Sequence, residues 1–273
     1  MSINVSEAVR EAKIMLEPVA EEEALQQAKI LVSTIAGIET SALTIHSEMV
    51  LAPEQLADLG EMLERRMQGE PLQYILGEWA FMGLPFYVDA RALIPRQDTE
   101  LLAETAIRLI RERGYSSCLD LCTGTGCVGI SIAKLAGIRV TGSDISREAI
   151  ALAKENAEFN EASVSFVESD LFERIPEKFD LIVCNPPYLT LDDMQSLQKE
   201  VTFDPKLALY GGGDGLDFYR KIAWDYQNHL NEKGVLLLEI GSTQAQSTAA
   251  LFSAQTSVLN DLSGNPRVLI VES

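Results

Sequence analysis

The sequence is short of positive charge. Its 22 lysine and arginine residues stand against 41 aspartate and glutamate residues, which gives a formal net charge of −19 at pH 7. Proteins that bind nucleic acid draw most of their affinity from lysine and arginine side chains that neutralise phosphates. We therefore expect no direct nucleic-acid partner for this protein.

Clusters of metal-binding residues are also missing. The two histidines, His46 and His229, are far apart in the sequence and near no other candidate ligand. The four cysteines lack CxxC spacing and lie in or beside apolar runs, so we expect reduced thiols in the core and no metal site. They are Cys118, Cys122, Cys127 and Cys184.

Long apolar runs are absent as well. No stretch approaches the roughly 20 apolar residues that a membrane span requires. The first residues, MSINVSEAVREAK, lack the basic and then apolar pattern of an export signal. We expect a cytoplasmic, monomeric protein without a membrane partner, and its 273 residues can bury one large core or two modest ones.

Residues 1–72 predict a small, all-helical domain. Pro53 stands at a plausible first-turn position, Gly69 is a plausible stop, and Gly37 follows another apolar run. This segment carries five basic against thirteen acidic side chains, so it does not suit a nucleic-acid clamp. Apolar residues recur at helical spacing before Gly69, at Leu56, Leu59, Leu63 and Met67.

The spacing of the apolar residues is no longer helical after residue 72. Residues 73–91 contain aromatic and β-branched residues around Gly83 and Pro85, which predicts a hairpin that links two domains. From residue 92 to residue 273, strand-like runs such as SSCLDL, RVTGSD, FDLIVC and GVLLLEI alternate with helical segments. This alternation predicts an α/β domain with a mostly parallel, doubly wound sheet, in which ligands bind at the carboxyl ends of the strands.

A glycine loop follows the first of these strands. DLCTGTGCVGI places Gly124, Gly126 and Gly129 in the GxGxxG spacing of nucleotide-binding loops, at the start of a helix. Asp144 ends the next strand and is placed to accept hydrogen bonds from a ribose. Nicotinamide dinucleotides and S-adenosylmethionine both carry such a ribose. The alternative is that the glycines only shape a turn and Asp144 caps the following helix.

The fourth strand, FDLIVC, ends in an Asn-Pro-Pro-Tyr turn. Proline removes an N–H donor and pushes the preceding residue out of the helical region, so the strand stops at Asn185. In a sheet of this kind the fourth strand lies beside the first. The turn, made of Asn185, Pro186, Pro187 and Tyr188, therefore faces the glycine loop, unless it serves only to end the strand.

The turn is suited to a planar NH₂ group. The Asn185 side-chain oxygen and the Pro186 carbonyl are two acceptors held close together, and Tyr188 offers an aromatic face for stacking. A planar NH₂ is a poor nucleophile because its lone pair is delocalised, so it needs strict positioning and an activated electrophile such as a methyl sulfonium. Hydride transfer has no use for paired acceptors, which favours S-adenosylmethionine over a nicotinamide.

On these motifs the chain resembles the class I S-adenosylmethionine-dependent methyltransferases that carry NPPY, and within them the HemK/PrmC family of peptide chain release factor glutamine N5-methyltransferases. The likeness extends over nearly the whole chain, and its blocks EPLQYILGE and PRQDTE are more specific than the methyltransferase core. It implies a Rossmann-like methyltransferase domain over residues 92–273 and a helical substrate-recognition domain over residues 1–72. It also implies an enzyme that methylates the amide of the Gly-Gly-Gln glutamine in release factors.

The same resemblance implies roles for individual residues. Asp144 would bind the ribose hydroxyls, and Asp170 and Leu171 would lie beside the adenine. Asn185 would contact both cofactor and substrate, and residues 185–188 would bind the target glutamine. The residues that would line the methionine part of the cofactor are Cys122, Thr123, Gly124, Thr125 and Gly126.

Three positions depart from the family pattern. Cys122 stands where the family usually has glycine, Gln97 where it usually has proline, and Leu171 where an aromatic residue is common. Cys122 narrows the cofactor loop if its backbone has a positive φ, and Leu171 removes an aromatic face near the adenine. Neither Cys122 nor Leu171 touches the Asn-Pro-Pro-Tyr turn, so we expect an effect on cofactor affinity rather than on methyl transfer.

Two other functions are compatible with parts of the pattern. A methyltransferase acting on an exocyclic amino group of a nucleic-acid base would use the same planar geometry, but such an enzyme needs a basic surface, and both the whole chain and its first 72 residues are acidic. A non-catalytic nucleoside-binding module would not need an intact Asn-Pro-Pro-Tyr turn. An acidic surface suits a release factor, which must itself approach ribosomal RNA.

Overall fold

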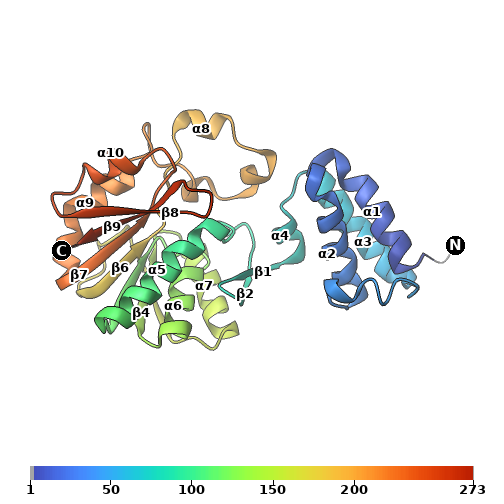
Figure 1. The fold of residues 1–273 in the computed structure, drawn as a ribbon, viewed down its shortest axis with the longest axis horizontal. Coiled ribbons are helices and arrows are strands. Elements are labelled where there is room, and N and C mark those ends of the chain that lie inside the picture. The colour runs from blue at the N-terminus through green and yellow to red at the C-terminus, as the bar shows by residue number, and fades with distance from the viewer. Residues whose placement is uncertain (1–2, 273) are drawn as a thin grey trace. The chain divides into compact units, whose positions relative to one another are not determined.

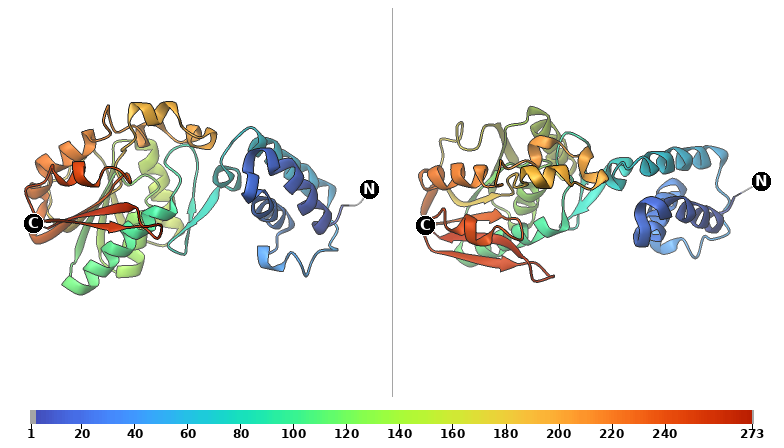
Figure 2. Two further views of the ribbon diagram at one scale, coloured as in Figure 1. Left: turned by 45° about the horizontal axis from the view of Figure 1, so that its top comes forward. Right: turned by 90° about the horizontal axis from the view of Figure 1, so that it is seen from above.

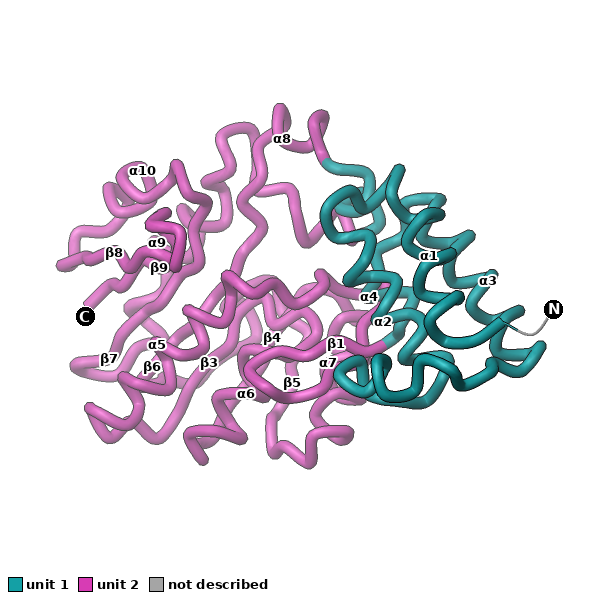
Figure 3. The backbone as a smooth tube through the Cα atoms, turned by 45° about the vertical axis from the view of Figure 1, so that its right-hand side comes forward, with its two compact units in different colours: residues 1–77, 198–203 teal, residues 78–197, 204–273 magenta. Residues whose placement is uncertain are grey.

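The computed structural model describes residues 3–272 and divides the chain into two compact units (Figures 1 and 3). Unit 1 comprises residues 1–77 and 198–203, and unit 2 comprises residues 78–197 and 204–273. The chain therefore passes from one unit to the other three times. The segment 198–203 has no counterpart in the division that the sequence suggests at residue 72.

Unit 1 is helical, and its helices end where the sequence predicts stops. Gly37 adopts φ 67° just after the second helix, and Pro53 occupies the first position of the third. Leu59 and Leu63 are buried in the core of this unit, whereas Met67, in the last turn, is exposed. The elements are α1 (Val5–Ala20), η1 (Glu21–Glu23), α2 (Ala24–Ala36), η2 (Thr40–Ala42), α3 (Pro53–Met67), α4 (Leu72–Leu76) and η3 (Lys199–Phe203).

A buried arginine joins segment 198–203 to the helices of unit 1. Arg66 on α3 is only 1% exposed. Its Nε donates to the Gln27 side-chain oxygen at 2.8 Å, and its guanidinium forms an ion pair with Glu200. A buried charge without a partner costs several kcal/mol. Segment 198–203 therefore supplies the counter-charge that the core of unit 1 requires.

Unit 2 begins with the hairpin that the sequence predicts, although the hairpin is shorter than expected. Strands β1 (Glu78–Phe81) and β2 (Leu84–Tyr87) pair antiparallel around Met82 and Gly83. Residues 72–76, which precede them, form helix α4 instead of a strand. Pro71 stands at the N-cap of α4, and Gly77 ends it in the left-handed region, so local signals at both ends favour the helix.

The rest of unit 2 is a sheet with helices on both faces (Figures 1 and 2). Within the described residues it has seven strands in the order β5-β4-β3-β6-β7-β9-β8. All neighbouring strands from β5 to β7 are parallel, and β9 runs antiparallel to both β7 and β8. The strands are β3 (Ser117–Leu121), β4 (Arg139–Asp144), β5 (Val164–Glu168), β6 (Phe179–Cys184), β7 (Leu230–Glu239), β8 (Thr256–Asn260) and β9 (Pro266–Glu272).

The helices of unit 2 cover the two faces of this sheet. Because successive strand residues point to opposite faces, Leu181 and Val183 of β6 pack with α5 and α6, whereas Ile182 and Cys184 pack with α9. No helix among residues 3–272 is long and apolar enough to cross a membrane. The helices are α5 (Gln97–Arg113), α6 (Cys127–Ala136), α7 (Arg147–Phe159), α8 (Leu191–Gln195), η4 (Lys206–Ala208), α9 (Asp217–His229) and α10 (Ala245–Ala249).

Candidate active site

Four parallel strands end in register at one edge of the sheet. Strand β3 lies between β4 and β6, and β7 follows β6, so the first strand of the doubly wound sheet does pair with the fourth. Side chains at neighbouring strand ends lie close together for this reason. From β4 to β7, the residues at this edge are Asp144, Cys122, Asn185 and Glu239.

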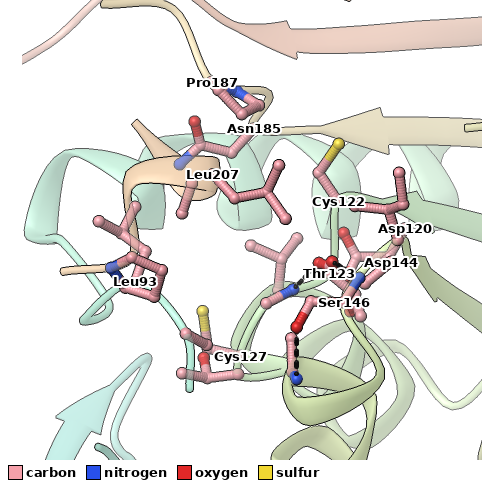
Figure 4. Close-up of a pocket in the computed structure, with 18 of the residues that line it drawn as sticks. Leu93, Asp120, Cys122, Thr123, Cys127, Asp144, Ser146, Asn185, Pro187 and Leu207 are labelled. Atoms are coloured by element: carbon pink, nitrogen blue, oxygen red, sulfur yellow. Dashed lines mark hydrogen bonds between the residues drawn. The ribbon is translucent and has the colours of Figure 1, made fainter. Parts of the chain in front are cut away.

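A cavity opens at this edge of unit 2 (Figure 4). Its walls come from residues 91–96, the glycine loop, residues 144–146, residues 169–171 and the segment from 205 to 208. Its volume, the open mouth included, is about 1010 Å³.

Most of the predicted site residues line this cavity. Gly126, Pro186 and Tyr188 are not among the lining residues: Gly126 is the N-cap of α6, Pro186 is buried, and Tyr188 packs against the hydrophobic cluster below α9. Those that do line it are Cys122, Thr123, Gly124, Thr125, Asp144, Asp170, Leu171, Asn185 and Pro187.

Asp144 holds the glycine loop by hydrogen bonds. One carboxylate oxygen accepts from the Gly124 N–H at 2.9 Å, where Gly124 has φ 55°, and the other accepts from the Ser146 N–H at 2.9 Å. A carboxylate offers about four acceptor sites, so these bonds leave acceptor capacity for a ligand in the cavity that Asp144 lines. Burial raises the pKa of Asp144 above its ordinary value.

Asp120 is a site residue that sequence reasoning missed. It is the fourth residue of β3, is 2% exposed, and accepts hydrogen bonds from Thr123 Oγ1 at 2.5 Å and from the Gly129 N–H at 3.0 Å. Burial raises the pKa of Asp120 to about 7. An acidic residue inside an otherwise apolar strand, just before the glycine loop, was the available signal. From its position on β3, Asp120 fixes the glycine loop through these hydrogen bonds, and it also lines the cavity.

The buried acids predict how stability depends on pH. Burial raises the pKa of both Asp120 and Glu239 to about 7, so the folded protein keeps protons that the unfolded chain loses near pH 4. The free energy of unfolding is therefore expected to fall as the pH rises from about 5 to about 7. In Asp120→Asn the fall should be smaller. Urea denaturation at several pH values between about 5 and about 7 measures the free energy of unfolding. If that free energy fell equally with pH in the parent and in Asp120→Asn, the raised pKa assigned to Asp120 would be wrong.

Hydrogen bonds connect the end of the Asn-Pro-Pro-Tyr turn to the glycine-rich segment 209–215. The Leu189 N–H donates to the Leu209 carbonyl, and the Gly211 N–H donates to the Leu189 carbonyl, both at 2.9 Å. A Cβ atom on Gly211 would lie 2.6 Å from the Pro187 carbonyl oxygen, so only glycine allows this approach. Gln244 Nε2 also donates to the Tyr188 carbonyl at 3.0 Å.

The block PRQDTE connects two walls of the cavity. Arg96 donates to Asp204 at 2.5 Å, and Asp204 also accepts from the Ile94 N–H at 3.3 Å. The Asp204 side chain is buried, so this pair fixes the start of the segment from 205 to 208. Thr99 Oγ1, from the same block, accepts from Asn185 Nδ2 at 3.2 Å. Sequence reasoning recognised the block but did not assign these contacts.

The three departures from the family pattern have different structural settings. Cys122 has φ 57° and Leu171 has φ 48°, so both non-glycine residues adopt the left-handed region at the cavity wall. Such a conformation costs of order 1 kcal/mol or more for a residue with a Cβ. Gln97 is the first residue of α5, a position that also suits proline.

The strand order, the glycine loop and the cavity at the strand ends define unit 2 as a class I methyltransferase fold. Comparison with solved structures agrees. A T. thermophilus 16S rRNA methyltransferase in complex with AdoMet and guanosine superposes with a TM-score of 0.50 at 19% identity, over 72% of this chain and 49% of that one. At this identity the likeness concerns the fold alone.

Family comparisons are more specific. The model of the PrmC N-terminal domain matches residues 7–77, and that of the methyltransferase small domain matches residues 97–216. A release factor glutamine methyltransferase of Geobacter sulfurreducens is 42% identical, over 85% of this chain and 82% of the relative. One of Cereibacter sphaeroides is 38% identical over 98% of both chains. The chain belongs to the release factor glutamine methyltransferase family, whose enzymes are S-adenosylmethionine-dependent.

Proposed function

We propose that this enzyme transfers a methyl group from S-adenosylmethionine to the side-chain amide nitrogen of the glutamine in the Gly-Gly-Gln motif of peptide chain release factors. The proposal agrees with the names of the curated relatives. The observation that carries it is the orientation of Asn185. Its Nδ2 donates to Thr99 Oγ1, which leaves the side-chain oxygen as an acceptor for an NH₂ group in the cavity.

The cavity residues fit the cofactor. Asp144 keeps free acceptor sites for a ribose diol, and Asp170 and Leu171 lie in the wall where an adenine would pack. When bound, S-adenosylmethionine supplies a methyl group made electrophilic by its sulfonium. We assign the methionine part to the glycine loop, which is formed by Cys122, Thr123, Gly124, Thr125 and Gly126.

The protein's own part in the reaction is orientation. Asn185 Oδ1 would accept one N–H bond of the substrate amide, and the carbonyl of Pro186, which stands between the cavity-lining Asn185 and Pro187, would accept the other once the substrate is bound. The two bonds aim the nitrogen lone pair toward the cofactor site. The apolar side chains of Ile94 and Leu207 line the cavity and would keep water from the reacting nitrogen. The amide nitrogen loses its proton after the methyl transfer, because alkylation makes its N–H acidic. No base is therefore needed to remove a proton before the attack.

Charge favours a protein substrate over a nucleic acid. The rRNA methyltransferase described above shares the fold, so the fold does not distinguish an amide from the amino group of a base. The net charge of −19 opposes binding to a phosphate backbone. We further propose that unit 1 recognises the release factor.

The test is a methylation assay with competing acceptors. The enzyme is incubated with labelled S-adenosylmethionine, an unmodified release factor, and unmethylated DNA or RNA, and the products are analysed by mass spectrometry. We expect one methyl group on the glutamine of the Gly-Gly-Gln peptide. A release factor with alanine in place of that glutamine is the control. Label on nucleic acid alone would refute the proposal.

A further inference from the structure

Glu239 is a buried acid next to the candidate site that the proposed reaction does not use. It ends β7, beside the end of β6 that leads into Asn185, and is 2% exposed. Its Oε2 has no hydrogen-bond partner among the described residues. Glu239 is not among the residues that line the cavity, so it reaches a substrate only through other side chains.

Two polar side chains connect Glu239 to the cavity. Thr99 and Asn185 are the polar side chains that face its carboxyl group. Asn185 Nδ2 also donates to Thr99 Oγ1 at 3.2 Å. A carboxylate only accepts hydrogen bonds, whereas a hydroxyl can donate one and accept others. An ionised Glu239 can therefore act only as an acceptor toward the Thr99 hydroxyl and Asn185 Nδ2, while the Thr99 oxygen accepts from Asn185 Nδ2.

This arrangement fixes which end of the Asn185 amide faces the cavity. An amide side chain can present its oxygen or its NH₂ group after a half-turn, and only the oxygen accepts from a substrate NH₂. We infer that Glu239 is a positioning residue whose buried carboxylate, acting directly and through Thr99, holds Asn185 Nδ2 so that Oδ1 faces the substrate. This role rests on the proposed function, because it assumes that the substrate presents an NH₂ group.

Among the charged and titratable groups around Glu239, Arg267 is the cation whose charge acts on its carboxylate, although the two form no ion pair within the described residues. Arg267, on β9, pairs with Asp98 at 3.0 Å and with Asp261 at 3.3 Å. Within residues 3–272, Glu239 has no ion-pair partner closer than 4 Å. The remaining facing groups come from α5, the turn, α6 and α9, namely Asp98, Tyr188, Cys127 and Tyr219.

The environment sets the pH at which the positioning fails. Burial raises the pKa of Glu239 to about 7 and the pKa values of Tyr188 and Cys127 to about 12, and it holds the pKa of Tyr219 well above its ordinary value. Below pH 7 the protonated carboxyl donates a hydrogen bond itself, and the direction of the chain through Thr99 is no longer fixed. The turnover rate at saturating cofactor should therefore rise with pH through about 7.

The first test measures this pH profile in matched variants. Glu239→Gln cannot ionise and should lose the rise in kcat near pH 7, while the KM for S-adenosylmethionine stays within about twofold. Glu239→Ala should lower kcat at pH 8 on the order of tenfold, since a misplaced reacting group is costly. Glu232→Gln, at the exposed opposite end of β7, is the control and should keep the parent profile. A rise that persists unchanged in Glu239→Gln would overturn the inference.

Thr99 provides a second variant in case Glu239 substitutions disturb the fold. Thr99→Val removes the hydroxyl and should lower kcat as Glu239→Ala does, while Thr99→Ser keeps the hydroxyl and should restore the parent rate. A purely structural role would not distinguish the two by their hydroxyl. Equal kcat values for Thr99→Val and the parent would contradict the role of this relay.

A spectroscopic measurement separates this inference from the proposed function. The side-chain NH₂ signals of Asn185, followed by NMR in the free protein, should shift with a midpoint near pH 7 in the parent but not in Glu239→Gln. Asp120, whose pKa is also about 7, remains in both proteins and so does not account for a difference between them. If the parent methylates no release factor but shows the titration, the proposed function fails and the positioning stands. An unchanged titration in Glu239→Gln refutes the positioning.

Discussion

Replacing Asn185 by alanine is expected to lower the rate of methyl transfer by about 10²–10³-fold, the range observed when one preorganised hydrogen-bonding group is removed from an active site. Asn185 lines the cavity, and its Nδ2 is engaged with Thr99, so its oxygen is the group directed to a substrate amide. Single-turnover measurements with the release factor report this rate without a contribution from product release.

The affinity of Asn185→Ala for S-adenosylmethionine should change little, because Asp144 and the glycine loop are intact. Calorimetry of the free enzyme checks this. Asn228→Ala, on the exposed surface of α9, is a matched control that should retain the parent rate. An Asn185→Ala enzyme that transfers methyl groups as fast as the parent would remove the assigned role.

Asp144→Ala should show the opposite pattern. The loss of charged hydrogen bonds to the ribose is expected to weaken cofactor binding by roughly 1.5–3 kcal/mol, which is about a 10- to 150-fold increase in Kd. The substitution also leaves the Gly124 and Ser146 N–H groups without the acceptor that they have in the parent. Titration calorimetry with S-adenosylmethionine measures the effect.

The rate at saturating cofactor should be affected less in Asp144→Ala than in Asn185→Ala, since Asp144 does not contact the reacting nitrogen. Asp192→Ala, exposed on α8, serves as the control for loss of a negative charge. If Asp144→Ala binds the cofactor as tightly as the parent, the ribose assignment is wrong.

The sequence allowed much of unit 2 to be predicted, because the relevant signals are local. The alternation of apolar strands and helices predicts the parallel sheet, and the position of the Asn-Pro-Pro-Tyr turn follows from the pairing of β6 with β3. The ends of α2 and α5 are likewise set by local signals, since Gly37 and Gly114 both adopt positive φ.

The contacts that were not predicted join residues far apart in the chain. Thr99 meets Asn185 across 86 residues, and Arg96 meets Asp204 across 108. No periodicity or motif specifies which strand end a helix N-terminus will approach. Glu239 was hidden for the same reason: in the run GVLLLEI it looks like a polar residue that ends a strand, and its environment is supplied by β6, β9 and α5.

The pair formed by Arg66 and Glu200 has a consequence for the order in which the chain folds. The two residues are 134 positions apart, although both belong to unit 1. Domains made on the ribosome usually fold as units, from the N-terminus onward. Here the helices of unit 1 are synthesised early, but their buried arginine has no counter-charge until residue 200 has emerged. Unit 1 therefore gains this ion pair only after most of the sheet strands of unit 2 have been synthesised, and a fragment that stops at residue 77 would lack the same counter-charge.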